Sequence, residues 1–199
     1  MSAPRRQDLE ALRRVARYLQ AEPRVIYEYK WQMEGCLKVY VDTDFAGCSQ
    51  TRKSTSGGCA MMGLHLVKHW SSTQRIVTLS SGEAELAGIV KGAAEALGLR
   101  SLSADFGVTS TIKMYADASA AIGVCRRSGI GKVRHLAVGQ LWVQERVRTG
   151  DLELYKIPGT TLPADELTKH LARETADRHL KAMSVMRVAG RAFSASHIL

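Results

Sequence analysis

A run of strand-like segments stands ahead of one long helix-like segment, and strands and helices alternate after it. β-Branched and aromatic residues, which favour strands, mark residues 25–29, 37–41, 57–62, 64–71, 75–79, 111–115 and 152–157. Turn-forming and polar residues at 47–56 separate the second and third segments, as in a hairpin with a long loop. This order predicts an α/β fold in which a mixed β-sheet is flanked by α-helices.

The longest predicted helix covers residues 81–102, which are rich in Ala, Leu and Glu. Ser80 or Ser81 together with Glu83 offers a helix start, so we expect Glu83 to be a capping group. Apolar residues at helical spacing predict an amphipathic helix at 7–20. Further helices are expected at 118–126, 137–148 and 164–186.

The composition fits one soluble globular domain with tails. The chain has 199 residues, of which 45% are hydrophobic and 24% are charged, and this length allows one core of about 100 to 150 residues. Lys and Arg outnumber Asp and Glu by 28 to 19, and the formal charge of +9 favours a polyanionic partner.

The spacing of the cysteines and the length of the apolar runs indicate the cellular compartment in which the protein is expected. The four cysteines show no CxxC spacing and are expected to be free thiols, which argues against a zinc site; they are Cys36, Cys48, Cys59 and Cys125. No apolar run approaches the roughly 18 to 20 residues of a membrane span, and the basic start is not followed by an apolar signal core. We expect a cytoplasmic or nuclear protein that is neither secreted nor embedded in a membrane.

Four carboxylates lie where the predicted secondary structure changes: Asp42, Glu85, Asp117 and Asp165. Side chains at such positions can converge at one edge of a sheet. Phosphodiester cleavage uses this arrangement, because carboxylate oxygens hold two magnesium ions about 3.5 to 4 Å apart. Most acidic residues are solvated surface groups, so the sequence around these four decides their interpretation.

The surrounding motifs form a recognisable series. They are LKVYVD at 37–42 with DFAG at 44–47 and RKSTSG at 52–57, LSSGEAEL at 79–86, YADASAAI at 115–122, and LPADELTK at 162–169. In this order the motifs closely resemble the ribonuclease H domain of copia-type retrotransposons, the C-terminal part of a retroelement Pol polyprotein. The resemblance covers roughly residues 7–171.

The resemblance implies a ribonuclease H-like fold and a metal-dependent endonuclease that hydrolyses the RNA strand of RNA–DNA hybrids. It implies two Mg²⁺ ions, for which Mn²⁺ would substitute. Asp42 would bridge both ions, Glu85 and Asp117 would complete one site, and Asp165 would hold the other ion beside the attacking water. The partners would be the hybrid and the reverse transcriptase domain of the same polyprotein.

The same resemblance divides the chain into three parts. Residues 1–34 would be an N-terminal helix and connection remnant of the reverse transcriptase, residues 35–171 the ribonuclease H domain, and residues 172–199 a helical or irregular tail. Two alternatives stay open: a catalytically silent module that only binds nucleic acid, and a connection module that serves a separate polymerase.

Two polar clusters are candidates for nucleic-acid binding. The first lies in the loop after the first acidic strand and comprises Arg52, Lys53, Ser54, Thr55 and Ser56; the second comprises Lys132, Arg134 and His135. A solvated turn is the plain alternative for the first. The second matches the family more loosely, because Ala137 and Gly139 stand where acidic and basic residues are usual. Asp44, two residues after Asp42, is expected at the rim of the site and not among the metal ligands.

Overall fold

The computed structural model describes residues 4–33, 35–129, 131 and 138–190. They divide into two compact units, one formed by the residues up to Glu28 with those from Val185 onward, the other by Tyr29–Ser184. The first unit contains α1 (Arg6–Ala21), β1 (Arg24–Tyr27) and β7 (Val185–Val188). β1 and β7 form a two-stranded antiparallel sheet in which Arg24 pairs with Val188.

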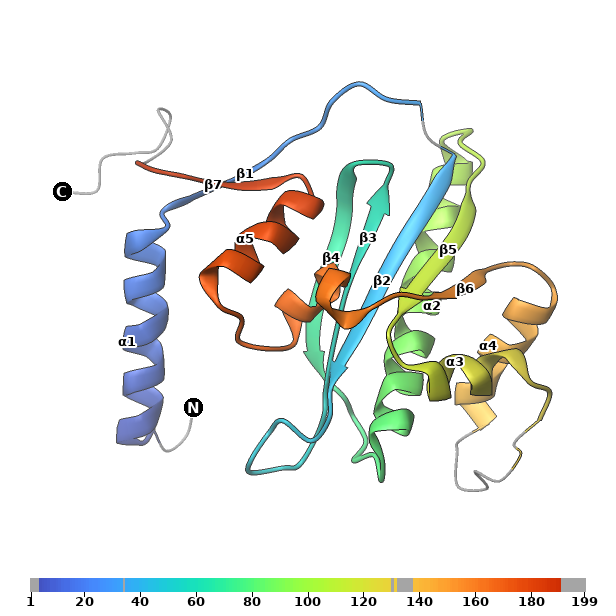
Figure 1. Ribbon diagram of the computed structural model, residues 1–199, viewed down its shortest axis with the longest axis horizontal. Helices are drawn as coiled ribbons and strands as arrows, with labels where there is room; N and C mark the ends of the chain where they lie inside the picture. Colours follow the sequence, from blue (N-terminus) through green and yellow to red (C-terminus); the bar gives the residue numbers. More distant parts are fainter. Residues whose placement is uncertain (1–3, 34, 130, 132–137, 191–199) are drawn as a thin grey trace. The chain divides into compact units, whose positions relative to one another are not determined.

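The second unit is built around a five-stranded mixed sheet (Figure 1). Its strands are β2 (Cys36–Asp44), β3 (Thr55–Met62), β4 (His65–Thr73), β5 (Thr111–Ala116) and β6 (Glu153–Lys156), in the order β4-β3-β2-β5-β6. β2, β3 and β4 are antiparallel neighbours, whereas β5 and β6 run parallel to β2. β2, the first of the five strands in the sequence, therefore lies at the centre of the sheet.

Helices and short 3-10 turns complete this unit: α2 (Ser81–Asp105), α3 (Ser119–Arg126), α4 (Val138–Arg148), η1 (Gly159–Thr161), η2 (Pro163–Leu167) and α5 (Arg173–Ala182). α2 lies close against one face of the sheet, because Gly88 and Gly92 bring its backbone next to Thr43 and Val41 of β2. η2 contacts β2 and β3 on the opposite face, in front of the sheet in Figure 1. The expected α/β fold class, a mixed β-sheet flanked by α-helices, is confirmed.

Two predicted elements are wrong. Residues 75–79 form no strand; the backbone N–H of Gln74 bonds to Ser54, and Thr78 pairs through its hydroxyl with Ser54 Oγ, so side-chain contacts fix this segment as it crosses to α2. Residues 164–186 do not form one helix. Pro163 opens the 3-10 turn η2, the chain then leaves helical geometry, and α5 begins only at Arg173.

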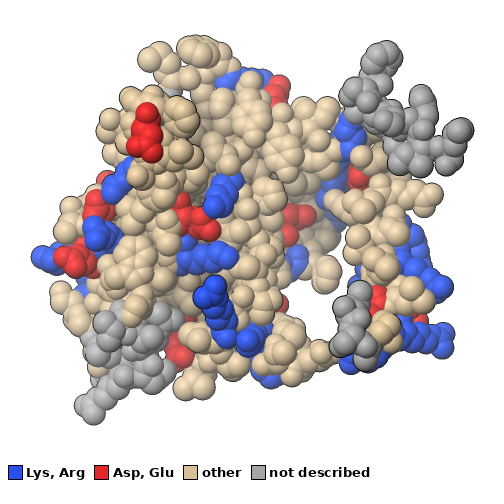
Figure 2. Space-filling model, turned by 180° about the vertical axis from the view of Figure 1, so that it is seen from behind, with Lys and Arg blue, Asp and Glu red and all other residues tan. Residues whose placement is uncertain are grey.

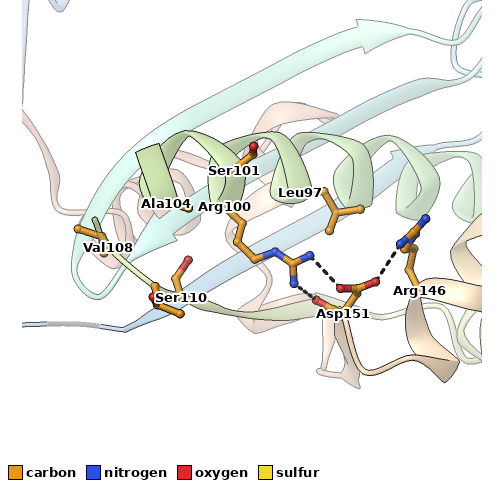
Figure 3. Close-up of a pocket in the computed structure, with 9 residues that line it drawn as sticks. Leu97, Arg100, Ser101, Ala104, Val108, Ser110, Arg146 and Asp151 are labelled. Atoms are coloured by element: carbon orange, nitrogen blue, oxygen red, sulfur yellow. Dashed lines mark hydrogen bonds and ion pairs between the residues drawn. The ribbon is translucent and has the colours of Figure 1, made fainter. Parts of the chain in front are cut away.

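An ion-pair network ties the C-terminal part of α2 to the turn before β6 (Figure 3). Asp151 accepts hydrogen bonds from Arg100 at 2.9 Å and from Arg146 at 3.0 Å. Hydrogen bonds from Arg100 first, then from Arg146 and Thr149, lower the pKa of Asp151 to about 2. The adjoining pocket of about 670 Å³ is lined by none of the four motif acids.

The structure also bears on cysteine chemistry and on membrane spans. All four cysteines are unpaired, and Cys59 and Cys125 are buried in the sheet and in α3. Within the described ranges, no helix combines the length and the apolar character needed to cross a bilayer.

Candidate active site

Asp42 and Asp117 are brought together by the parallel pairing of β2 with β5. Tyr40 pairs with Tyr115, and each aspartate lies two residues farther along the chain. Because side chains two residues apart point to the same face of a sheet, both carboxylates lie on one face at the same edge. Asp42 is still within β2, whereas Asp117 follows the last residue of β5.

Glu85 is positioned by the way α2 begins. Ser80 caps the helix by accepting a hydrogen bond from the Glu83 backbone, and the Glu83 side chain accepts one from the Leu79 backbone. The expected capping role of Glu83 is confirmed. The carbonyl of Ala84 accepts hydrogen bonds from Thr43 Oγ1 and Gln74 Nε2, which fasten the first turn of α2 to β2 and to the end of β4. Glu85 is the next residue and is held at the edge where β2 and β5 end.

Three carboxylates converge there: oxygen atoms of Asp42, Glu85 and Asp117 all lie within 4.8 Å of one another. Asp42 is only 1% exposed. Burial first, and then the charges of Asp42 and Asp117, raise the pKa of Glu85 to about 8. Burial followed by the charge of Asp42 also raises the pKa of Asp117. The cluster concentrates negative charge where water screens it poorly, so a bound cation would stabilise it.

The donor set fits a hard divalent cation. Each of the three side chains offers carboxylate oxygen, which is what Mg²⁺ and Mn²⁺ prefer, and no histidine or cysteine belongs to this cluster of described residues. Three carboxylates leave room in an octahedral shell for water and a substrate oxygen.

Asp165 lies outside that cluster and is paired with a lysine. Lys169 Nζ is 2.6 Å from Asp165 Oδ1 and 3.3 Å from Asp42 Oδ2. Burial lowers the pKa of the Lys169 ammonium, but hydrogen bonds and charges from Asp165 and Asp42 more than offset this, so the pKa is raised overall. Asp165 is thus linked to Asp42 through a cation supplied by the chain.

Thr168 and Lys169 are site residues to which the sequence reasoning gave no role. Thr168 Oγ1 donates a hydrogen bond to Asp42 Oδ2. A signal was present, because the two residues follow Asp165 at positions i+3 and i+4, which share one side of a helical turn. Gly57, paired with Asp42 across the sheet, makes the contact possible: a Cβ there would lie 2.6 Å from Thr168 Cγ2.

The predicted nucleic-acid-binding loop is only partly accessible. Ser54 and Ser56 are buried, and their hydroxyls are used inside the protein, Ser54 Oγ accepting from the Ala46 backbone and Ser56 Oγ from Gln74 Nε2. Arg52 is exposed, and Lys53 and Thr55 are partly so. Lys132, Arg134 and His135 lie outside the described residues.

Two other surface features bear on the site. Asp44 lines a pocket of about 490 Å³ with Thr168, Lys169 and His170, and its carboxylate folds over Gly47. Figure 2 shows Lys and Arg side chains spread over the face seen from behind, with acidic side chains among them. On this face the excess positive charge does not form a patch of one sign.

Comparisons with known proteins place these motifs in a wider context. The chain is 28% identical over 191 residues to the retrovirus-related Pol polyprotein from transposon RE1 of Arabidopsis thaliana, covering 94% of this chain and 13% of the polyprotein. It is 30% identical over 139 residues to the corresponding polyprotein from transposon TNT 1-94 of Nicotiana tabacum, covering 69% and 10%. The chain is homologous to retrotransposon Pol polyproteins. The resemblance that the motifs predict is confirmed. The chain spans only about an eighth or less of the length of these Pol polyproteins.

Solved ribonuclease H structures give more distant likenesses. The LC11 ribonuclease H1 in complex with an RNA/DNA hybrid has a TM-score of 0.47 at 15% identity, covering 66% of this chain and 93% of that one. The N-terminal RNase H domain of a Mycobacterium tuberculosis protein has a TM-score of 0.47 at 17% identity, covering 75% and 99%. No protein-family model matches the chain.

Proposed function

We propose that this chain is a divalent-metal-dependent ribonuclease H that hydrolyses the RNA strand of RNA–DNA hybrids. The observation that carries the proposal is the convergence of Asp42, Glu85 and Asp117 within 4.8 Å at one edge of the sheet. Homology to Pol polyproteins supports it, since ribonuclease H activity acts on the hybrids that reverse transcription makes.

The side chains have distinct roles in this proposal. Asp42, Glu85 and Asp117 would hold Mg²⁺, and the family resemblance gives Asp165 a second ion. A bound ion supplies Lewis-acid stabilisation of the negative charge that develops on the phosphate during attack by water. The protein fixes the carboxylates through the β2–β5 register, the capped start of α2 and the Thr168 hydrogen bond. The products would carry a 3′-hydroxyl and a 5′-phosphate.

Binding to the hybrid would use mainly its backbone. Arg52 and Lys53 in the loop after β2, and Thr55 at the start of β3, are the accessible members of the predicted cluster. Their cations and hydroxyl suit phosphate and sugar oxygens. Within a Pol polyprotein, residues 1–34 would be the remnant of the connection to the reverse transcriptase, residues 35–171 the nuclease and residues 172–199 a tail. The reverse transcriptase would be the partner that supplies the hybrid.

A cleavage assay tests the proposal. The purified chain, given a hybrid with labelled RNA, is expected to cut the RNA with Mg²⁺ or Mn²⁺ and not with Ca²⁺ or a chelator. Asp42→Asn is the matched control. No cleavage by the wild type above this control, across a range of metal concentrations, would refute the nuclease; retained hybrid binding would then favour the silent binding module.

A further inference from the structure

The Lys169 ammonium lies between the carboxylates of Asp165 and Asp42, 2.6 Å from the first and 3.3 Å from the second. The family resemblance assigns this same pair of carboxylates to the second of two metal ions. We propose that Lys169 takes the place of the second ion, so that the chain binds one divalent cation and supplies the other positive charge itself. The inference rests on the proposed function, because it concerns the same site.

One carboxylate oxygen of Asp42 already has partners within the protein. Its Oδ2 accepts a hydrogen bond from Thr168 Oγ1 and also faces the Lys169 ammonium. One oxygen of the carboxylate thus has a hydroxyl donor and a cation beside it. A second ion on the Asp165 side would have to compete with the Thr168 hydroxyl and the Lys169 ammonium for Oδ2. Asp42 is therefore arranged to hold one ion, shared with Glu85 and Asp117.

The backbone fixes Lys169 in this position. The N–H groups of Thr168 and Lys169 both donate to the Asp165 carbonyl, at 3.2 and 3.1 Å. The same turn is held against β2 by the Thr168 hydrogen bond to Asp42. The Lys169 side chain is 43% exposed, so more than half of its surface is covered. The turn therefore brings the ammonium to the two carboxylates, and the ion pairs with both hold it there.

Lysine suits this role chemically. Its ammonium is a compact charge with three N–H donors. One donates to Asp165 and the ammonium also pairs with Asp42, so a donor remains that can reach a phosphate oxygen of the hybrid. A divalent ion at the same place would have to displace the ammonium from both carboxylates. It would also lie beside a like charge unless the lysine swung away.

Counting bound ions tests the inference without reference to turnover. Mn²⁺ is titrated into the full chain and followed by calorimetry and by electron paramagnetic resonance. The wild type is expected to bind one ion at the carboxylates. Lys169→Met, which keeps the stem and removes the charge, is expected to bind two and to show the signal of a spin-coupled pair. Two ions in the wild type, none in the wild type, or one in Lys169→Met would each overturn the inference.

Two further variants control for folding and charge. Lys169→Arg keeps the charge and is expected to bind one ion, and a second ion in this variant would contradict the charge argument. Lys181→Met removes an exposed lysine on α5 and is expected to leave one ion. Thermal unfolding of each variant establishes that the ions are counted on folded protein.

Cleavage assays on the same samples separate this inference from the proposed function. If the wild type cleaves hybrid but binds two ions, the nuclease stands and the role of Lys169 fails. If the wild type binds one ion, Lys169→Met binds two and neither cleaves, the role of Lys169 stands and the nuclease fails.

Discussion

Thr168 donates a hydrogen bond from Oγ1 to Oδ2 of Asp42, a residue 126 positions earlier in the chain. The bond joins the turn that carries Asp165 to the central strand that carries the most buried acid of the site. It fixes the orientation of the Asp42 carboxylate, and with it the oxygen that is presented to Glu85 and Asp117.

Thr168→Val should weaken the site without removing any metal ligand. A hydrogen bond to a charged group contributes about 1.5 to 3 kcal/mol. If this is expressed in the transition state, cleavage should slow by roughly ten- to a hundredfold. Thr168→Ser keeps the hydroxyl and should stay within a few-fold of the wild type. Single-turnover cleavage of a labelled hybrid measures both, and equal rates for valine and threonine would show that the bond does not matter.

Asp42 and Asp44 should differ sharply although they are two residues apart on β2. Asp42→Asn removes a shared member of the carboxylate cluster and should abolish measurable turnover. Asp44 is not one of the three converging acids, and Asp44→Asn should cost about tenfold, roughly 1.4 kcal/mol of transition-state stabilisation. Cleavage rates across a Mg²⁺ titration compare the two. Equal loss, with equally weakened metal dependence, would mean that Asp44 is also a ligand.

Gly57→Ala should damage both stability and the site. The added Cβ would lie 2.6 Å from Thr168 Cγ2 and 3.1 Å from the Leu167 carbonyl carbon, so η2 must shift. Overpacking of this kind costs about 1 to 3 kcal/mol. Gly98→Ala is the matched control, because an exposed Cβ in the middle of α2 meets nothing within 4 Å and should stabilise by about 0.5 to 1 kcal/mol. Denaturant unfolding measures both, and a neutral Gly57→Ala would show that η2 adapts freely.

Glu85 should make the metal-free protein less stable as the pH rises. Its folded pKa of about 8 lies above the ordinary glutamate pKa of 4.5, so folding favours the protonated form. The stabilising contribution is complete below pH 4.5 and is lost as the pH rises through about 8. In the presence of chelator, the free energy of unfolding should fall over this window. Glu85→Gln cannot ionise and should show a flatter profile; the same slope in both proteins would assign the loss to other groups.

Affinity for the hybrid should fall steeply with salt and depend little on sequence. Each phosphate neutralised contributes a log–log slope of about −0.7 to −0.9. The double variant Arg52→Ala with Lys53→Ala should therefore make the slope shallower by the contribution of about one or two phosphate contacts. Lys181→Ala, on α5, should leave it unchanged. Fluorescence anisotropy at several salt concentrations gives the slopes, and an unchanged slope in the double variant would remove the loop from the interface.

The four acids could be singled out from the sequence because they lie where the predicted secondary structure changes and because the motifs around them resemble a known family. Ser80 with Glu83 marks the start of α2 locally. The parallel pairing that brings Asp42 and Asp117 together is visible only in the structure. The spacing of Thr168 and Lys169 from Asp165 is visible in the sequence, but their contacts with Asp42 are not, because Asp42 is distant in sequence. The polarity of Ser54 and Ser56 is visible in the sequence and predicts contacts with phosphate, whereas their burial beside Gln74 and Thr78 depends on tertiary packing.

The antiparallel pairing of β1 with β7 has a consequence for any shortened version of the chain. Arg24–Tyr27 pairs with Val185–Val188. In the sequence, the unit at 29–184 therefore lies between two strands that are hydrogen-bonded to each other. A boundary drawn at residue 171, the expected end of the nuclease part, would delete α5 and β7 together. β1 would then be left with unpaired backbone N–H and C=O groups, which invite association with another chain. Self-association would follow from the place of the cut, even with every acid of the site retained.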